Sequence, residues 1–346
     1  MRIRGLGRLK AKWAKLRGQL TPGPMVLLYH RVAHLAQDPH LLAVTPEHFE
    51  EHLVALRRYC RVVSLSELAE SLAHGNRTGA GVVLTFDDGY ADNAETAMPL
   101  LEKHNCPATF YLASGLVGSA REYLQDDLER LVLLAPDCPD QLHLTVGGQH
   151  YLWGIRSRNP EHEDALTAGG CNMTSENDPT PRHRAHREIH ALLRRASPSE
   201  RERGLEQLRR QCGDPGPARS THRAMSWDQA RQMAACKLAD LGAHTVNHPY
   251  LSVLPLAEQR AEILESKRTL EEQIGRPVGS FAYPYGPRQS YGAETVGLLK
   301  ELGFSNACSN FRDRIGLLTD RFQIPRFVVR DWDGDEFLRQ IRKGHL

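Results

Sequence analysis

The chain has 346 residues, of which 40% are hydrophobic and 25% are charged, and its formal net charge is +2. This composition is typical of a soluble globular protein with a sizeable core, and the length suits one large α/β domain or two ordinary ones. A net charge so close to zero excludes a global attraction to nucleic acid, so we expect no nucleic-acid partner.

Seven cysteines are scattered along the chain, and no two of them have the CxxC spacing. Their odd number argues against a disulfide framework, and their spacing argues against a zinc site built of thiolates. We therefore expect free thiols in a reducing compartment.

The N-terminal segment is strongly basic, because residues 1–17 carry seven Arg or Lys side chains and no acid. No apolar run of signal-peptide length follows it, and no run in the chain is long enough to span a bilayer. We interpret residues 1–23 as a solvated basic tail or, alternatively, as an amphipathic helix on an anionic membrane surface. The expected location is cytoplasmic, with peripheral membrane contact as the alternative.

From residue 24 onward, short apolar runs alternate with helical patterns. The expected strands cover residues 25–30, 61–63, 82–86, 108–112, 238–244, 280–283, 304–308 and 322–329. One helix is expected to begin at residue 45, a second covers residue 64 to about residue 72, and a third ends near residue 104. Another begins at residue 226, and two more cover residues 256–274 and 293–302. This alternation favours parallel strands in an α/β fold, either layered or a barrel.

Residues 115–224 interrupt this rhythm. They are rich in charged residues, His, Pro and Gly, contain few strand signals, and look helical only at residues 188–193 and 200–211. We interpret them as an insertion across the outside of the core, or as a small partner-binding module. Six histidines in the insertion lack a compact ligand spacing and are expected at the surface: His143, His150, His162, His183, His186 and His190.

The apolar run 82–86 ends in two adjacent carboxylates, Asp87 and Asp88, followed by Gly89. Two neighbouring acids at the end of a buried strand repel one another unless a cation or a shared proton offsets the charge. The carboxyl ends of strands are also where α/β proteins place their chemistry. The simpler alternative is an Asp-Gly turn without further function.

A second group of chemical interest is His244 and His248, four residues apart directly after an expected strand. Pro249 prevents an ordinary helix from continuing, so the two imidazoles can converge on one ion. Imidazole suits zinc, iron, copper or nickel, and Asp88 or Asp87 could add an oxygen ligand. Two histidines and one carboxylate leave positions open for water and substrate, as in a catalytic site.

Three further strand ends carry polar groups: His30, the turn at residues 283–286, and Arg326. Taken alone, each is more often a structural feature than a functional one. Together they would lie at the same edge of a parallel sheet.

Three segments, in this order, resemble the motifs of the polysaccharide deacetylase family, the NodB-homology group of carbohydrate esterase family 4. They are TFDDGY (Thr85–Tyr90), HTVNHPYLS (His244–Ser252) and FAYPYG (Phe281–Gly286). LLYHRV (Leu27–Val32) and residues 45–72 resemble the branch that includes biofilm poly-N-acetylglucosamine deacetylases. The resemblance extends from about residue 24 to residue 329, without much of the insertion.

The resemblance implies a distorted (β/α) barrel of about seven strands, formed by residues 24–346, with one divalent metal at the strand C-termini. Zinc is the first expectation for that metal. By motif position, Asp88, His244 and His248 match the metal ligands and Asp87 the catalytic base. Tyr285 matches the residue whose backbone N–H helps to hold the oxyanion.

The chain departs from the common family pattern at two positions. No motif near the C-terminus supplies the general-acid histidine, so His30 is its match in the branch that begins with a Tyr-His strand. Ala282 and Tyr283 stand where the usual arginine precedes Pro-Tyr-Gly. Arg326 is the expected substitute.

The expected function is a metal-dependent hydrolase that removes N-acetyl or O-acetyl groups from an N-acetylated sugar, polysaccharide or glycan precursor. Asp87 would take a proton from water and His30 would protonate the departing amine. The alternatives are a non-heme iron enzyme with the same triad and a non-catalytic carbohydrate-binding barrel. The sequence does not identify the sugar, although a cytoplasmic precursor fits better than a finished extracellular polymer.

Overall fold

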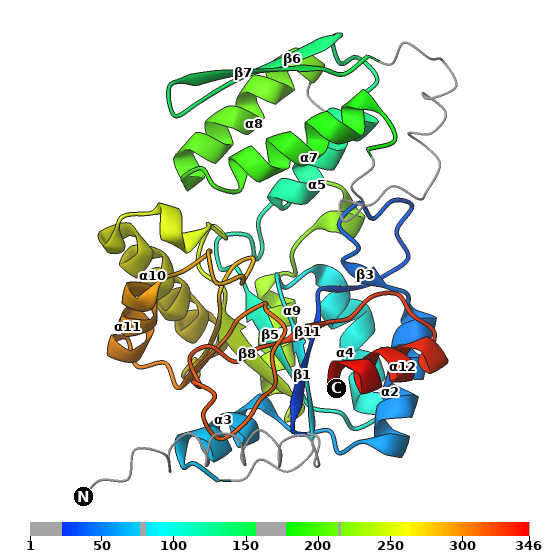
Figure 1. Ribbon diagram of the computed structural model, residues 1–346, viewed down its shortest axis with the longest axis vertical. Helices are drawn as coiled ribbons and strands as arrows, with labels where there is room; N and C mark the ends of the chain where they lie inside the picture. Colours follow the sequence, from blue (N-terminus) through cyan, green and yellow to red (C-terminus); the bar gives the residue numbers. More distant parts are fainter. Residues whose placement is uncertain (1–22, 77–80, 157–177, 214–215, 346) are drawn as a thin grey trace, which may run out of the picture.

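The computed structural model describes residues 23–76, 81–156, 178–213 and 216–345 (Figure 1). Expectations for the basic N-terminal segment therefore fall almost entirely outside the described residues. Within the described ranges, no helix combines the length and the apolar character needed to cross a bilayer.

The centre of the fold is a seven-stranded sheet in which every pairing is parallel. In spatial order its strands are β10 (Asn306–Cys308), β9 (Ser280–Ala282), β8 (Ala239–Ala243), β5 (Ala108–Leu112), β4 (Val82–Phe86), β1 (Met25–Tyr29) and β11 (Phe327–Val328). The parallel α/β architecture expected from the alternation is confirmed. The predicted strand at residues 61–63 is only an isolated bridge from Val62 to Val82.

One short segment connects the two edges of this sheet. Ile324 pairs with Cys308 of β10, and Phe327 pairs with Leu27 of β1. Backbone hydrogen bonds run from Ser309 N–H to the Ile324 carbonyl (2.9 Å) and from Val329 N–H to the Leu28 carbonyl (3.0 Å). The sheet is thus curled into a distorted seven-stranded (β/α) barrel, as expected.

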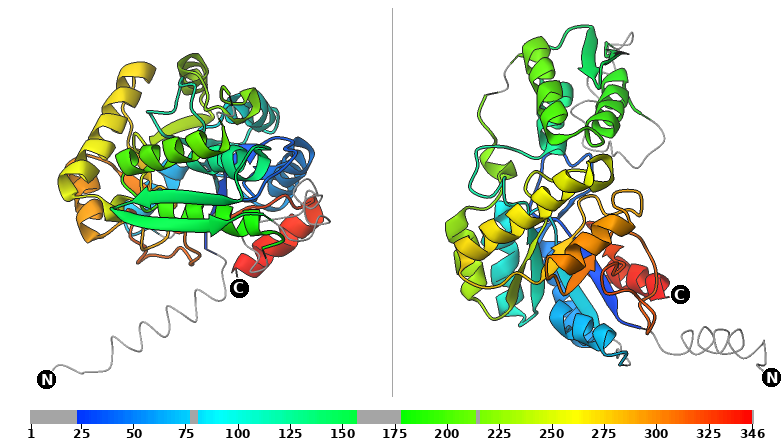
Figure 2. Two further views of the ribbon diagram at one scale, coloured as in Figure 1. Left: turned by 90° about the horizontal axis from the view of Figure 1, so that it is seen from above. Right: turned by 90° about the vertical axis from the view of Figure 1, so that its left-hand side faces the viewer.

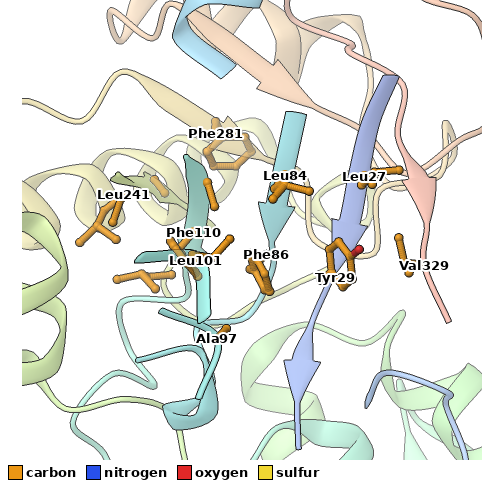
Figure 3. Packing of buried hydrophobic residues seen from close by; sticks show 14 of the residues in the cluster. Leu27, Tyr29, Leu84, Phe86, Ala97, Leu101, Phe110, Leu241, Phe281 and Val329 are labelled. Atoms are coloured by element: carbon orange, nitrogen blue, oxygen red, sulfur yellow. The ribbon is translucent and has the colours of Figure 1, made fainter. Parts of the chain in front are cut away.

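The strands are buried on both faces, which is why their sequences are almost continuously apolar. Leu27, Tyr29, Leu84 and Phe86 pack outward against the helices, whereas alternate residues such as Val83 belong to a separate interior cluster. Figure 3 shows the outer layer, in which the Tyr29 and Phe110 rings stack on opposite sides of Phe86 at centroid distances of 5.2 and 4.8 Å.

Helices surround the barrel (Figure 2). They are α2 (Pro46–Tyr59), α3 (Leu65–Ala73), a π-turn (Asn93–Ala97) continued by α4 (Met98–Lys103), α9 (Trp227–Ala235), α10 (Leu256–Ile274), α11 (Ala293–Glu301) and α12 (Gly334–His345). Short 3₁₀ turns occur at Ser220–His222 and Leu251–Val253, and a small parallel pair is formed by β2 (Arg31–Val32) and β3 (Ala43–Val44). The predicted N-caps Ser64 and Ser226 each accept a hydrogen bond from the third residue of their helix.

The insertion forms a second lobe at one end of the barrel (Figures 1 and 2). It contains α5 (Leu124–Leu128) with a π-turn (Glu129–Leu134), a hairpin of β6 (Gln141–Val146) and β7 (Gln149–Gly154), α7 (Pro181–Leu193) and α8 (Pro198–Cys212). These elements share a hydrophobic cluster of their own. The expectation of few strand signals was wrong, because Leu142, Leu144 and Val146 alternate with exposed residues before a Gly-Gly turn.

The expectation that the insertion histidines lie at the surface was wrong for half of them. His143 and His150 are exposed, and His162 lies outside the described residues. His183, His186 and His190 are buried, because α7 turns one face toward the barrel side of the lobe.

Candidate active site

Three side chains that are distant in sequence meet at the carboxyl ends of neighbouring strands. Asp88 follows β4, and His244 and His248 follow β8, with β5 between them. The Nε2 atoms of His244 and His248 lie 3.5 and 3.3 Å from Asp88 Oδ1. All three side chains are buried.

The donor atoms of this triad are free to bind a cation. Asp88 Oδ1 and His244 Nε2 are buried without a hydrogen-bond partner, which is rare and costly for polar atoms. His244 Nδ1–H donates to the Ala282 carbonyl (2.7 Å), so Nε2 is the ring nitrogen that faces Asp88. Burial lowers the pKa of His248 to about 3, which keeps its imidazole in the neutral, ligating form. The three residues therefore fit a divalent transition metal.

The backbone around the triad is held in an unusual conformation. Asp88 (φ 74°), Thr245 (φ 65°), His248 (φ 51°) and Tyr285 (φ 61°) are four of the six non-glycine residues with positive φ in the described chain. Such strain persists where the surrounding structure over-determines it, and it concentrates at functional sites. Gly89 (φ 70°) is required sterically as well, because a Cβ there would lie 2.4 Å from Leu112 Cδ2.

Asp87 points to a different partner from its neighbour. Its two carboxylate oxygens each lie 2.7 Å from a terminal nitrogen of Arg326, whose Nε donates to the Ser309 carbonyl. Burial alone raises the pKa of Asp87, but the charges of Arg326 and His244 outweigh it and lower the pKa below its usual value. Arg326 thus stands where it holds Asp87 ionised, and Asp87 Oδ2 lies 4.0 Å from His244 Nε2.

His30 follows β1 and is half-buried. Burial lowers the pKa of its imidazole, Asp88 and Asp87 raise it, and Arg326 and Arg330 lower it, so the net pKa is below its usual value. The structure therefore places His30 within electrostatic range of both carboxylates. Its backbone carbonyl is fixed by Asn93 Nδ2 (2.8 Å).

The Tyr285 ring packs against that of His248, with 4.7 Å between the ring centroids. Its backbone N–H donates to no acceptor among the described residues, and its hydroxyl oxygen is buried without a partner. The turn therefore presents an unused donor beside the triad, at the position matched to the oxyanion residue.

Sequence reasoning missed three residues that shape this site. The Tyr123 hydroxyl donates to the Asp88 carbonyl. Glu262 accepts hydrogen bonds from the backbone N–H groups of residues 246 and 247 (both 2.9 Å). Arg201 of the insertion donates from Nη1 to the carbonyls of Asn247 and His248 (both 3.2 Å). No spacing signal could reveal them, because each comes from a distant element.

A second group with metal-ligand composition, Asp126, Glu129 and His222, lies where the insertion joins the barrel. Arg219 pairs with Glu129 (3.3 Å) and with Glu122 (2.8 Å), and the Tyr90 hydroxyl donates to Asp126 (2.7 Å). Because arginine supplies the compensating charge, we interpret this group as a structural junction.

Comparison with known proteins agrees with this geometry. The family model described as polysaccharide deacetylase matches residues 74–134 and 215–307, on both sides of most of the insertion. YxkH of Bacillus subtilis, assigned to the polysaccharide deacetylases, is 26% identical over 108 residues, or 31% of this chain. The match spans only 37% of the length of that relative.

Solved structures extend the similarity over most of the chain. IcaB from Ammonifex degensii is 20% identical with a TM-score of 0.57, and covers 94% of this chain and 98% of its own. The deacetylase PplD of Streptococcus pyogenes, solved in complex with acetate, is 16% identical with a TM-score of 0.55, and covers 91% and 96%. At these identities the structures show the shared fold. The family match and the three motifs show that this chain is similar to the polysaccharide deacetylase family.

Proposed function

We propose that this protein is a metal-dependent hydrolase that removes acetyl groups from an N-acetylated sugar, polysaccharide or glycan precursor. The observation that carries the proposal is that two adjacent carboxylates at one strand end, Asp87 and Asp88, have different partners. Asp88 Oδ1 lies 3.5 and 3.3 Å from the Nε2 atoms of His244 and His248, whereas Asp87 is held by Arg326. One site suits a cation and the other a proton acceptor.

Asp88, His244 and His248 would hold one divalent ion, with zinc as the first candidate. Such an ion lowers the pKa of water toward neutrality and polarises an acetyl carbonyl. The sequence pattern and the free donor atoms support this assignment, and the identity of the ion is part of the proposal.

Asp87 is the proposed general base. Arg326 keeps the Asp87 carboxylate ionised. The Asp87 side chain is only 6% exposed, so bulk water hardly competes with Arg326 for this carboxylate. Asp87 would accept a proton from the attacking water, while Arg326 would hold the carboxylate in a fixed orientation through two parallel hydrogen bonds.

His30 is the proposed general acid, because an amine that leaves without a proton is a very poor leaving group. Its lowered pKa makes the proton it carries easier to release, and the two neighbouring carboxylates favour its protonated form. The backbone N–H of Tyr285 would donate to the oxygen that becomes negative when the acetyl carbonyl is attacked.

The test is acetate release by the purified protein from a panel of N-acetylated sugars, glycans and precursors, together with metal analysis. We expect one divalent ion per chain and acetate release that stops when a chelator removes it. Metal-loaded protein that binds such sugars but releases no acetate would contradict the proposal and favour a non-catalytic carbohydrate-binding barrel.

A further inference from the structure

Beside the candidate site lies a group of cationic and imidazole side chains with no acidic partners. We call His40, His186, His190, Arg194 and Arg201 the basic cluster. Among the described residues, no carboxylate lies within ion-pair distance of Arg194 or Arg201. This distinguishes the cluster from the junction at Arg219, where every cation faces an acid.

Three members of the cluster form one stripe of α7 and its C-cap. His186, His190 and Arg194 are spaced four residues apart, so their side chains lie on the same face of the helix. His40, from the connection between β2 and β3, packs onto this stripe with ring centroids 4.6 Å from His190 and 5.7 Å from His186. The insertion, through this stripe, and the barrel, through His40, thus form the basic cluster together.

Arg201 contacts the triad, and its charge lowers the pKa of His190 in the stripe. It is 8% exposed in the first turn of α8, and its Nη1 donates to the carbonyl of His248 itself. Its other two guanidinium nitrogens, Nε and Nη2, are buried and have no partner. The side chain is therefore anchored at one end while its remaining donors are unused.

Unused polar atoms are concentrated at this place. Of eleven buried side-chain atoms without a hydrogen-bond partner in the described chain, two belong to the triad. Six more belong to the cluster and the adjoining tyrosine: His40 Nε2, His186 Nε2, Arg194 Nε, Arg201 Nε, Arg201 Nη2 and Tyr285 Oη. Native structures rarely leave such atoms unsatisfied, so the concentration points to a ligand.

The acids of the elements that carry His40 and the triad are already engaged. Asp38, in the same connection as His40, accepts hydrogen bonds from the N–H groups of Leu42 (2.9 Å) and Ala43 (2.7 Å). Asp88 belongs to the triad and Asp87 to Arg326. A buried guanidinium without an opposite charge is strongly unfavourable, so the missing charge would come from the bound ligand.

We propose that the basic cluster binds a phosphoryl group of the substrate, so that the acetylated sugar is attached to its carrier through a phosphate or diphosphate. This inference rests on the proposed deacetylase function. Guanidinium edges match phosphate oxygens geometrically, and the number of unused donors exceeds what the two oxygens of one carboxylate could occupy. The carrier itself could be a nucleotide or a lipid, since both present the same phosphoryl chemistry.

The first test measures anion binding without catalysis. Inorganic diphosphate is titrated into the full chain by calorimetry, with a chelator present so that no metal can hold the anion. We expect Arg194→Gln and Arg201→Gln each to weaken binding at least about tenfold, as expected for a lost hydrogen bond to a charged group. Arg203→Gln is the matched control for Arg201→Gln, because Arg203 is an exposed arginine that also lies in α8.

Arg201→Lys keeps a cation and a donor, so it covers the case in which Arg201→Gln fails to fold. It should bind diphosphate more weakly than the wild type, because one donor edge is lost, and more tightly than Arg201→Gln where that variant folds. Diphosphate affinity that is equal in wild type, Arg194→Gln and Arg201→Gln would mean an adventitious ion only and would overturn the proposal.

The second test compares acetate release from one N-acetylated hexosamine in four forms: a neutral methyl glycoside, a 1-phosphate, a nucleotide diphosphate ester and a polyprenyl diphosphate ester. We expect a lower KM for the phosphorylated forms and loss of that advantage in Arg194→Gln, and the better diphosphate ester identifies the carrier. Equal KM values for neutral and phosphorylated forms would overturn the proposal. Arginine-dependent diphosphate binding without acetate release from any form would leave the anion site standing and refute the deacetylase function.

Discussion

Asp87 and Asp88 are adjacent in sequence but serve different partners, and their backbone explains how. The positive φ of Asp88 turns its carboxylate toward the two histidines, whereas Asp87 faces Arg326. Two identical side chains therefore acquire different chemistry from a single backbone turn.

Asp87→Asn should retain the metal and lose most turnover, because the amide cannot accept a proton but no ligand is removed. Asp88→Asn should lose the metal, because the triad loses its only carboxylate. Metal content by elemental analysis and acetate release would be measured on both variants. If Asp87→Asn empties the site and Asp88→Asn leaves it filled, the two roles are reversed.

His30→Ala should reduce deacetylation of an amide by about 10²–10⁴-fold, the usual contribution of a positioned general acid. Hydrolysis of an activated acetate ester should fall much less, because its leaving group needs no proton. The ratio of the two rates is the measurement. Equal losses on both substrates would make His30 a packing residue.

At the residue level, the sequence predicted the positions that chemistry constrains locally. The acid-tipped strand and the spaced histidines indicated a metal site with either Asp87 or Asp88, and the resemblance to the deacetylase motifs selected Asp88. Arg326 was a candidate from its strand end. Arg201 and Tyr123 could not be predicted, because their contacts depend on how the insertion folds back onto the barrel.

At the level of elements, strands and capped helices were predicted where periodicity and caps agree, as at Ser226. The hairpin of β6 and β7 was missed because polar composition hid its alternation. Helix α12 was also not predicted. It is held by a contact with a residue far away in the sequence, because the Phe337 ring stacks on that of His52 with 3.9 Å between the ring centroids. Tertiary packing decides such elements more than local propensity does.

Packing of β8 against its neighbour gives a prediction about stability. A Cβ on Gly242 would lie 2.5 Å from the ring of Tyr111 and 3.0 Å from the Ser280 carbonyl. Gly242→Ala should therefore destabilise the fold by about 1–3 kcal/mol, as overpacking usually does. Chemical denaturation would measure the change in the free energy of unfolding.

Gly297→Ala is the matched control for Gly242→Ala. Gly297 lies inside α11, and a Cβ there meets nothing within 4 Å. Alanine is the better helix former, so this variant should be neutral or stabilised by up to about 1 kcal/mol. Equal destabilisation in both variants would contradict the packing argument.

At the level of the whole molecule, the buried pair of Asp87 and Arg326 predicts a dependence of stability on pH. The folded-state pKa of Asp87 is lowered, so its contribution is present above the unfolded pKa of about 3.9 and is lost as pH falls toward the folded value. The free energy of unfolding should decrease through this range by at most about 1.4 kcal/mol per pH unit from this group.

Asp87→Asn should show a smaller decrease over the same pH range, with chelator present in both samples so that metal loss does not contribute. Denaturation midpoints between pH 5 and about pH 2 would provide the comparison. An unchanged pH dependence in the variant would show that other carboxylates dominate acid unfolding.

The segment that joins both edges of the sheet also carries Arg326, and this has a consequence for the order of assembly. Asp87 and Arg326 are 239 residues apart, so their contact is among the costliest in chain entropy. During synthesis the N-terminal strands emerge first, and the acid-tipped strand must wait for almost all of the remaining chain. Closure of the barrel and pairing of Asp87 with Arg326 are therefore one late event. A nascent barrel that has not yet closed also lacks Arg326, the partner of the proposed base Asp87.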